Sequence, residues 1–273
     1  MIQGRQFYVG PACAKRSTTA RPEFVAPRQA RTAETLLIVP EILRNQQNFG
    51  SCIGQSTAFA TSSSVYPTSG RFLWVEARRH DLDLAGVDDG TNFDAAFWVV
   101  ENVGVAAYDA TENDGTPQNI DIAQFGPHLD SELQASDHKF TLNVSSVNPS
   151  AGNAFDLIVA AIASGHRVTF ASGLHDAFFS LAPGQIATAN ELGGNDNGHA
   201  QAFCGFDLRT RQLFVLNSWG DFAGLIVAKA DYTDPRWPGQ IDRGTFWELP
   251  GAYAITAETL PALWEIHVVE VVR

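Results

Sequence analysis

Apolar residues recur at helical spacing through the first half of the chain. Three helices are predicted from this pattern, over residues 52–65, 71–79 and 95–103. Thr91 or Asn92 is expected to cap the third helix, and Gly104 to end it. The first is rich in glycine, serine and threonine, which are weak helix formers, so it needs burial by the rest of the chain.

Shorter apolar runs and stricter alternation mark the second half. Residues 154–164 predict one amphipathic helix, closed by Gly165. Strands are predicted over residues 140–144, 166–171, 200–206, 212–216, 244–250 and 264–272. Helices first and strands afterwards indicate an α+β architecture in two lobes.

Residues 1–35 show no periodicity and carry three prolines among scattered arginines, which predicts an irregular N-terminal arm. We expect this arm to drape over the body of the protein or to bind an assembly partner. A short pro-segment that is later removed is the alternative. The remaining domain would span residues 36–273, with a helical lobe over about 45–135 and a β-rich lobe over about 136–273.

The charge balance bears on partners and compartment. Eighteen basic and thirty acidic residues give a net charge of −12, which argues against nucleic acid and anionic membrane surfaces as partners. Neither a transmembrane run nor an apolar signal-peptide core is present in the sequence. A cytoplasmic or virion-associated protein is therefore expected.

The cysteines are Cys13, Cys52 and Cys204, an odd and low number that does not describe a disulfide framework. A reducing compartment is the simpler expectation. The sequence has no CxxC or HExxH spacing, so we expect neither a metal site nor a cofactor.

Cys52 has a context that chemistry could use. It follows Gly50-Ser51 at the start of a predicted helix, where the positive end of the helix dipole favours the nucleophilic thiolate. Taken alone, however, a cysteine is more often a small buried apolar residue than a nucleophile. A catalytic role for Cys52 therefore needs support from other residues.

Two later segments support a catalytic role for Cys52. Asn197-Gly198-His199-Ala200 lies directly before a predicted strand, and Asn217-Ser218-Trp219-Gly220 directly follows the next one. The start of one hairpin strand lies beside the end of the other, so His199 and Asn217 should be neighbours. A thiol, an imidazole and an amide can act together as a nucleophile, its general base and the group that orients the base.

These segments resemble the papain-like cysteine peptidases, in the bacterial and viral branches of that family. Gln46 and Gly50-Ser51-Cys52 are similar to the family's oxyanion-hole glutamine and nucleophile, six positions apart. Gly198-His199-Ala200 resembles the histidine strand, and 217–220 matches the Asn-Ser-Trp-Gly motif letter for letter. The resemblance covers roughly residues 40–270 and implies a helical lobe, an antiparallel sheet or barrel, and a site in the cleft between them.

The resemblance also implies roles for single residues. Cys52 would attack a peptide carbonyl, and His199 would carry the proton to the leaving amine. Asn217 would complete the catalytic triad by orienting the histidine, while Gln46 would contribute to the oxyanion hole. Trp219 would shield the contact between His199 and Asn217 from water.

Three positions depart from the family pattern. Ile53 stands where tryptophan usually follows the nucleophile, and Phe49 replaces a cysteine that many members use in a disulfide. Phe222 is the nearest substitute for a second tryptophan after 217–220.

Cys204 lies an odd number of residues after His199, so we expect it on the opposite strand face, in the core.

The resulting hypothesis is a hydrolase, a thiol protease that acts as an endopeptidase on proteins or peptides. One alternative is a catalytically weak or inactive papain-like domain that serves as a structural component of a virion or another assembly. Another is a thiol acyltransferase or amidase that uses the same triad.

Overall fold

The computed structural model describes residues 14–27, 33–46, 50–63, 66–81, 90–108, 135, 137–195 and 197–272. Cys13, and Phe49 with the departure from the family pattern noted for it, lie outside these ranges.

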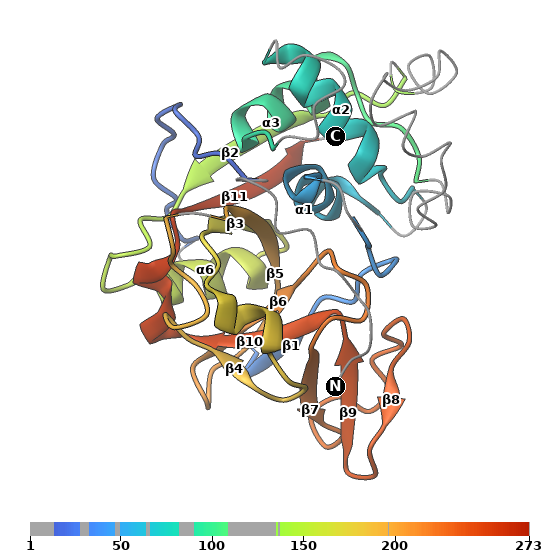
Figure 1. Cartoon of the computed structure of the whole chain (residues 1–273), viewed down its shortest axis with the longest axis vertical. Helices are drawn as coiled ribbons and strands as arrows, with labels where there is room; N and C mark the ends of the chain where they lie inside the picture. Colours follow the sequence, from blue (N-terminus) through green and yellow to red (C-terminus); the bar gives the residue numbers. More distant parts are fainter. Residues whose placement is uncertain are drawn as a thin grey trace.

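A large mixed sheet forms the centre of the fold, in the order β2-β11-β3-β5-β6-β10-β4, and β1 pairs with β5 off this path (Figure 1). Neighbouring strands are antiparallel, except that the short strand β4 is parallel to β10. The strands are β1 (Thr35–Leu37), β2 (Thr141–Ser146), β3 (Arg167–Ser172), β4 (Ile186–Ala187), β5 (His199–Asp207), β6 (Gln212–Leu216), β10 (Ala252–Thr256) and β11 (Glu265–Val272).

A smaller sheet, β7-β9-β8, projects at the lower right of Figure 1. The remaining elements are β7 (Gly224–Ala228), β8 (Ile241–Asp242), β9 (Phe246–Pro250), α1 (Cys52–Thr61), α2 (Gly70–His80), α3 (Phe93–Asn102), α6 (Ala154–Ala163), and the 3₁₀ turns η2 (Asp176–Ser180) and η3 (Ala257–Ala262). The α+β prediction is confirmed, because α1–α3 precede the main run of strands.

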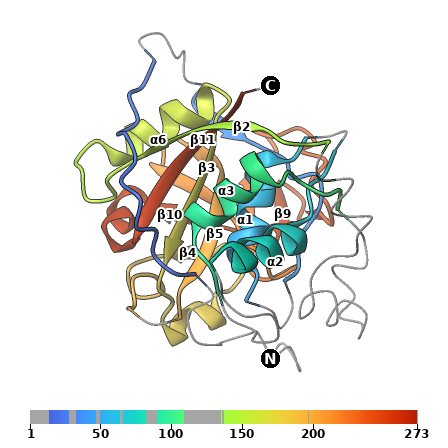
Figure 2. The same cartoon turned by 90° about the horizontal axis from the view of Figure 1, so that it is seen from above.

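The two faces of the main sheet are covered by different helices, as the view in Figure 2 shows. Alternate residues of a strand point to opposite faces. Accordingly, Val168 and Phe170 of β3 pack with α6, whereas Ala171 packs with α1–α3. The sheet thus separates two cores, and α1 lies against it on the side of the helical lobe.

Helix α1 depends on tertiary burial, as its weak propensity predicts. Every one of its residues is buried. The predicted helix to residue 65 is too long, because Ser62 already has extended backbone angles. Its hydroxyl accepts hydrogen bonds from Thr68 N–H at 2.8 Å and from the guanidinium of Arg44 at 3.0 Å. These bonds hold Ser62 to the next segment, and serine readily makes such alternatives to helix.

Gly54 lets α1 and α2 approach closely, and Gly54→Ala is expected to destabilise the protein. A Cβ here would lie 2.1 Å from Gly70 O and 2.9 Å from Trp74 Cβ, so the helices must separate. We expect a loss of about 3 kcal/mol in the free energy of unfolding, measured by urea denaturation. Gly152→Ala is the control, since nothing lies within 4 Å of its added Cβ. Equal stability of the two variants would contradict the prediction.

The caps of α3 follow the sequence prediction in part. Asn92, and not Thr91, is the N-cap, and its side-chain oxygen accepts from Ala95 N–H at 2.9 Å. Gly104 follows the end of the helix with a φ of +111°, a conformation that favours glycine. His199 is the first residue of β5 and does not precede it, a one-residue difference of the kind expected at strand ends.

Sequence patterning missed β1, β4, β7, β8 and β10. Three of them have two or three residues, too few for alternation to be visible. β10 is buried at its first four positions because it pairs with β6 inside the sheet, so its sequence does not alternate.

The described part of the N-terminal arm runs as an extended segment along the edge of the main sheet (Figure 1). Phe24 N–H donates to Ser146 O at 2.8 Å, and Ser146 N–H donates to Pro22 O at 2.8 Å. The arm therefore pairs with Ser146 at the end of β2, the edge strand, and occupies the backbone groups of that residue.

Candidate active site

Cys52 is the first residue of α1 and is completely buried. Ser51 is its N-cap residue, and the Ser51 carbonyl accepts the first helical hydrogen bond, from Gln55 N–H at 3.0 Å. The thiol therefore lies at the positive end of the α1 dipole, where negative charge is stabilised.

His199 and Asn217 meet at the open end of the hairpin formed by β5 and β6. His199 Nε2 lies 2.8 Å from Asn217 Oδ1, and the same oxygen accepts from Ser218 N–H at 2.7 Å. Two donors at one atom identify it as the amide oxygen, which can only accept. His199 Nε2 must therefore carry a proton, which leaves Nδ1 as the nitrogen able to take one up.

The contact between α1 and β5 indicates how Cys52 and His199 lie relative to each other. Ser56 Oγ donates to Gln201 O at 2.7 Å. Cys52 lies one helical turn before Ser56, and His199 lies two residues before Gln201. Further along, Phe59 of α1 packs in one cluster with residues 202 and 204 of β5, so the two elements run in the same direction. Cys52 and His199 are therefore at the same end of the two elements.

Trp219 covers the imidazole of His199. The two rings stack with centroids 4.4 Å apart and planes inclined by 25°. Behind Trp219 lie Phe178, Phe179 and Phe222, with ring centroids between 5.4 and 5.9 Å from it. Phe222 thus belongs to the aromatic cluster that excludes water from the histidine.

Gln46 is held against the segment that follows Asn217. Its N–H donates to Ser218 O at 2.7 Å, and Ser218 Oγ donates to Gln46 Oε1 at 2.5 Å. Asn45 forms an antiparallel bridge with Trp219, and Gly220 N–H donates to Arg44 O at 2.9 Å. Because Ser218 binds the oxygen end of the Gln46 amide, the NH₂ end is turned away from Ser218.

The N-terminal arm reaches this site through Ala14 and Lys15. Ala14 N–H donates to Gly198 O at 2.9 Å, next to His199, and Lys15 N–H donates to Thr91 O at 2.8 Å. A Cβ on Gly198 would lie 2.1 Å from Ala14 O, so glycine is required for this close approach. The arm therefore bridges the helical lobe and the histidine strand beside the site.

Asp94 of α3 anchors the arm. Thr18 N–H and Thr19 N–H each donate to Asp94 Oδ2 at 2.9 Å, and Arg21 pairs with Asp94 Oδ1 at 2.7 Å. Burial by itself raises the pKa of Asp94, but the hydrogen bonds from Thr19, Arg21 and Thr18 outweigh it and lower the pKa below its ordinary value.

The anchoring of the arm is expected to weaken in acid. A carboxylate with a lowered pKa contributes stability that is complete above its unfolded pKa of about 3.9 and is lost as pH falls through the lower folded value. The NMR amide signals of Thr18 and Thr19 should therefore move toward unfolded positions below about pH 4, while the Phe170 signal stays native. Asp94→Asn should abolish this dependence. If the pH dependence of the Thr18 and Thr19 signals persists in Asp94→Asn, Asp94 is not the group that causes it.

Cys204 lies on the opposite face of β5 from His199, as its odd offset predicts. It is fully buried in the cluster with Phe214 and Leu225, and burial raises the pKa of its thiol. Among the described residues, no three His, Cys, Asp or Glu side chains gather in a way that could hold a metal ion. None of the helices in the described ranges has the length and apolar character needed to cross a membrane.

Sequence reasoning did not find Ser218 as the partner of Gln46, nor Gly198 and Thr91 as the partners of the arm. The first pair is 172 residues apart, and no local pattern marks such a contact. The one available signal was Gly198 itself, since glycine before a strand indicates a close backbone approach.

No protein-family model matches this sequence, and no curated protein matches it significantly. Solved structures do match. Xylellain, a cysteine protease from Xylella fastidiosa, has a TM-score of 0.69 at 18% identity, with 100% of both chains covered. Digestive procathepsin L 3 from the larval midgut of Tenebrio molitor has a TM-score of 0.59 at 14% identity, over 96% of this chain and 76% of that one.

A third match is the Carica candamarcensis cysteine protease CMS1MS2, in complex with E-64. Its TM-score is 0.53 at 16% identity, over 88% of this chain and 100% of that one. This chain therefore has the two-lobed α+β fold of the papain-like cysteine proteases. The fold expectation drawn from the short motifs is confirmed across the length of the chain.

Proposed function

We propose that the protein is a cysteine peptidase that hydrolyses peptide bonds through Cys52, His199 and Asn217. The observation that carries this proposal is the 2.8 Å contact between His199 Nε2 and Asn217 Oδ1, and the position of Cys52 at the N-terminus of α1 supports it. The nucleophile, base and orienting amide come from three separate segments. Their presence together in a papain-like fold supports a shared chemical role.

The reaction would proceed in two steps. His199 Nδ1 takes the proton of Cys52, and the thiolate forms a bond to the peptide carbonyl carbon. The NH₂ group of Gln46 and the N–H of Cys52 donate to the oxyanion. His199 then gives its proton to the leaving amine as the C–N bond breaks. Water, deprotonated by His199, attacks the thioester and releases the acid with the regenerated thiol.

The substrate is proposed to be a protein or peptide, with no nucleic acid or membrane surface as partner. The net charge of −12 supports this, because it disfavours approach to phosphate-rich surfaces. The backbone carbonyls of Gly198 and Thr91, beside the site, also accept hydrogen bonds from the peptide backbone of the arm.

The pH dependence of Cys52 alkylation tests the proposal. With a small iodo-reagent and site-resolved mass spectrometry, we expect Cys52 to stay reactive well below the ordinary thiol pKa of about 8.5. The imidazolium of His199 and the α1 dipole both stabilise the thiolate, so His199→Ala should move the profile upward. Cys13 and the buried Cys204 serve as internal references. A Cys52 rate no higher than that of an ordinary thiol would reject the proposal.

Two alternatives predict different outcomes. An inactive papain-like domain with a structural role in a virion or another assembly would show neither rapid alkylation nor turnover. A thiol acyltransferase or amidase would show rapid alkylation, but the acyl-enzyme would transfer to added amines. Products formed by water alone in the presence of competing amines would reject transfer.

A further inference from the structure

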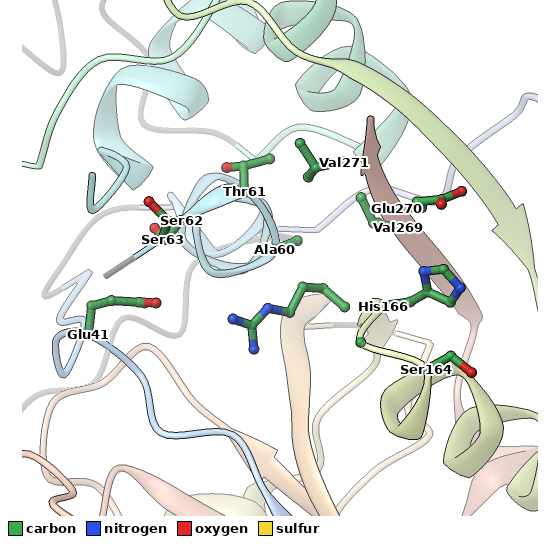
Figure 3. A pocket seen from close by; sticks show the side chains of 12 residues that line it. Glu41, Ala60, Thr61, Ser62, Ser63, Ser164, His166, Val269, Glu270 and Val271 are labelled. Carbon is green, nitrogen blue, oxygen red and sulfur yellow. The ribbon is translucent and has the colours of Figure 1, made fainter. Parts of the chain in front are cut away.

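A polar cavity of about 570 Å³ lies at the end of α1 that is opposite to Cys52 (Figure 3). Its walls are residues 60–63, residues 164–167 before and within β3, residues 269–271 of β11, and Glu41. The volume falls in the range of small-molecule sites, roughly 300–1,000 Å³. None of the four residues proposed for catalysis lines it.

Arg167 provides the positive charge of this cavity. Its guanidinium carbon lies 5.0 Å from the centre of the Phe59 ring, in a cation–π contact. Burial lowers the pKa of Arg167, and the nearby Glu41 carboxylate offsets part of that effect. Within the described part of the chain, no hydrogen-bond acceptor or ion-pair partner engages the guanidinium directly. Its N–H groups match a carboxylate in bidentate geometry.

Negative charge faces Arg167 from the other side. The Glu41 side chain extends into the cavity in Figure 3 and, among the described residues, has no direct hydrogen-bond partner. The C-terminal end of α1, at residues 60–61, forms the adjoining wall and contributes the negative end of its dipole. This side of the cavity favours a cation, above all an ammonium group.

The other ionisable side chains of the lining, Glu270 and His166, face elsewhere. Figure 3 shows Val269 and Val271 directed toward α1, whereas Glu270 points away. Glu270 accepts a hydrogen bond from Asn143 Nδ2 at 3.0 Å, and His166 packs edge-on against Phe24 with ring centroids 5.9 Å apart. The cavity thus combines one guanidinium, one carboxylate and an apolar wall.

We propose that this cavity binds a small zwitterion, an amino acid or a dipeptide. Its carboxylate would pair with Arg167, its ammonium with Glu41 and the end of α1, and its side chain would contact Val269 and Val271. A simple anion would meet Glu41 and the helix end, and a simple cation would meet Arg167. Only a ligand with both charges satisfies both sides, and this inference does not depend on the proposed peptidase activity.

The test uses glycyl-leucine as the probe with the full chain carrying Cys52→Ala, which prevents turnover. Methyl NMR signals of Val269 and Val271 should shift in a saturable manner. N-acetylglycyl-leucine lacks the ammonium and glycyl-leucinamide lacks the carboxylate. Each should bind at least about tenfold more weakly, because one charge-assisted interaction is lost.

Variants assign each charge to its residue. In Arg167→Gln, glycyl-leucine and glycyl-leucinamide should bind with equal affinity. In Glu41→Gln, glycyl-leucine and N-acetylglycyl-leucine should bind with equal affinity. Glu270→Gln, which alters a charge that points away, should keep the original affinity. Unchanged melting temperatures show that the variants fold. The proposal is overturned if no probe shifts these methyl signals at millimolar concentration, if all three bind alike, or if Arg167→Gln and Glu41→Gln leave the preferences intact.

Discussion

Cys52→Ala is expected to reduce the hydrolysis of a peptide substrate by at least about 10⁴-fold in kcat. The thiol is the atom that bonds to the substrate in the proposed reaction, and alanine offers no nucleophile in its place. Cys52 is fully buried at the start of α1, and alanine is smaller, so the fold should persist. The measurement is kcat with a single fluorogenic peptide that the parent cleaves, together with the melting temperature of each variant.

Cys204→Ala is the matched control for Cys52→Ala. It removes a thiol of equal burial from β5, away from the proposed triad, so activity should stay within a few-fold of the parent. His199→Ala should match the loss in Cys52→Ala, and combining the two should add little, because the residues act as a unit. Activity that survives Cys52→Ala would show that another group performs the hydrolysis.

Gln46→Ala is expected to lower kcat by about 10²- to 10³-fold with little change in KM, the usual cost of losing one oxyanion donor. Ser218 Oγ and Ser218 O hold Gln46 at both its side chain and its backbone. Its NH₂ group is therefore oriented before the substrate arrives. Donation to a charge that exists only in the transition state affects kcat and leaves substrate binding nearly unchanged. Steady-state kinetics on the purified variant measure both constants.

Two further variants separate donation from packing at Gln46. Gln46→Glu keeps the shape but replaces the donor with a carboxylate, so it should lose at least as much as Gln46→Ala. Ser218→Ala keeps the donor and removes only the hydroxyl that orients it, so its loss should be smaller, about tenfold or less. A kcat for Gln46→Ala close to that of the parent would remove this residue from the proposed oxyanion hole.

Much of the fold could be read from the sequence because its signals are local. The apolar spacing in residues 71–79 and 154–164 predicts α2 and α6 within one or two residues of their observed ends. The hairpin of β5 and β6 has a short polar turn, so the proximity of His199 and Asn217 followed from strand geometry. Residues that carry chemistry on adjacent strands are therefore within reach of sequence reasoning.

The parts that sequence reasoning missed depend on contacts between distant segments. β10 is hidden because burial on both faces removes its alternation, and its pairing with β4 joins residues that are far apart in the chain. Arg167 reads as the second residue of a strand, and only the packing of α1, β3 and β11 turns it into the wall of a cavity. Such features arise from the assembly of elements, not from the pattern of any one of them.

By itself, the sequence determined the types and order of the main elements and the residues capable of the chemistry, Cys52, His199, Asn217 and Gln46. These depend on local spacing and on side-chain chemistry. Only the tertiary structure decided that Ser218 orients Gln46, that Trp219 covers His199, and that the arm lies over Gly198. The contact between Ser218 and Gln46 and the contact between the arm and Gly198 each join residues far apart in the chain. Their partners are selected when burial leaves few polar groups available, and no periodicity within a single segment records that selection.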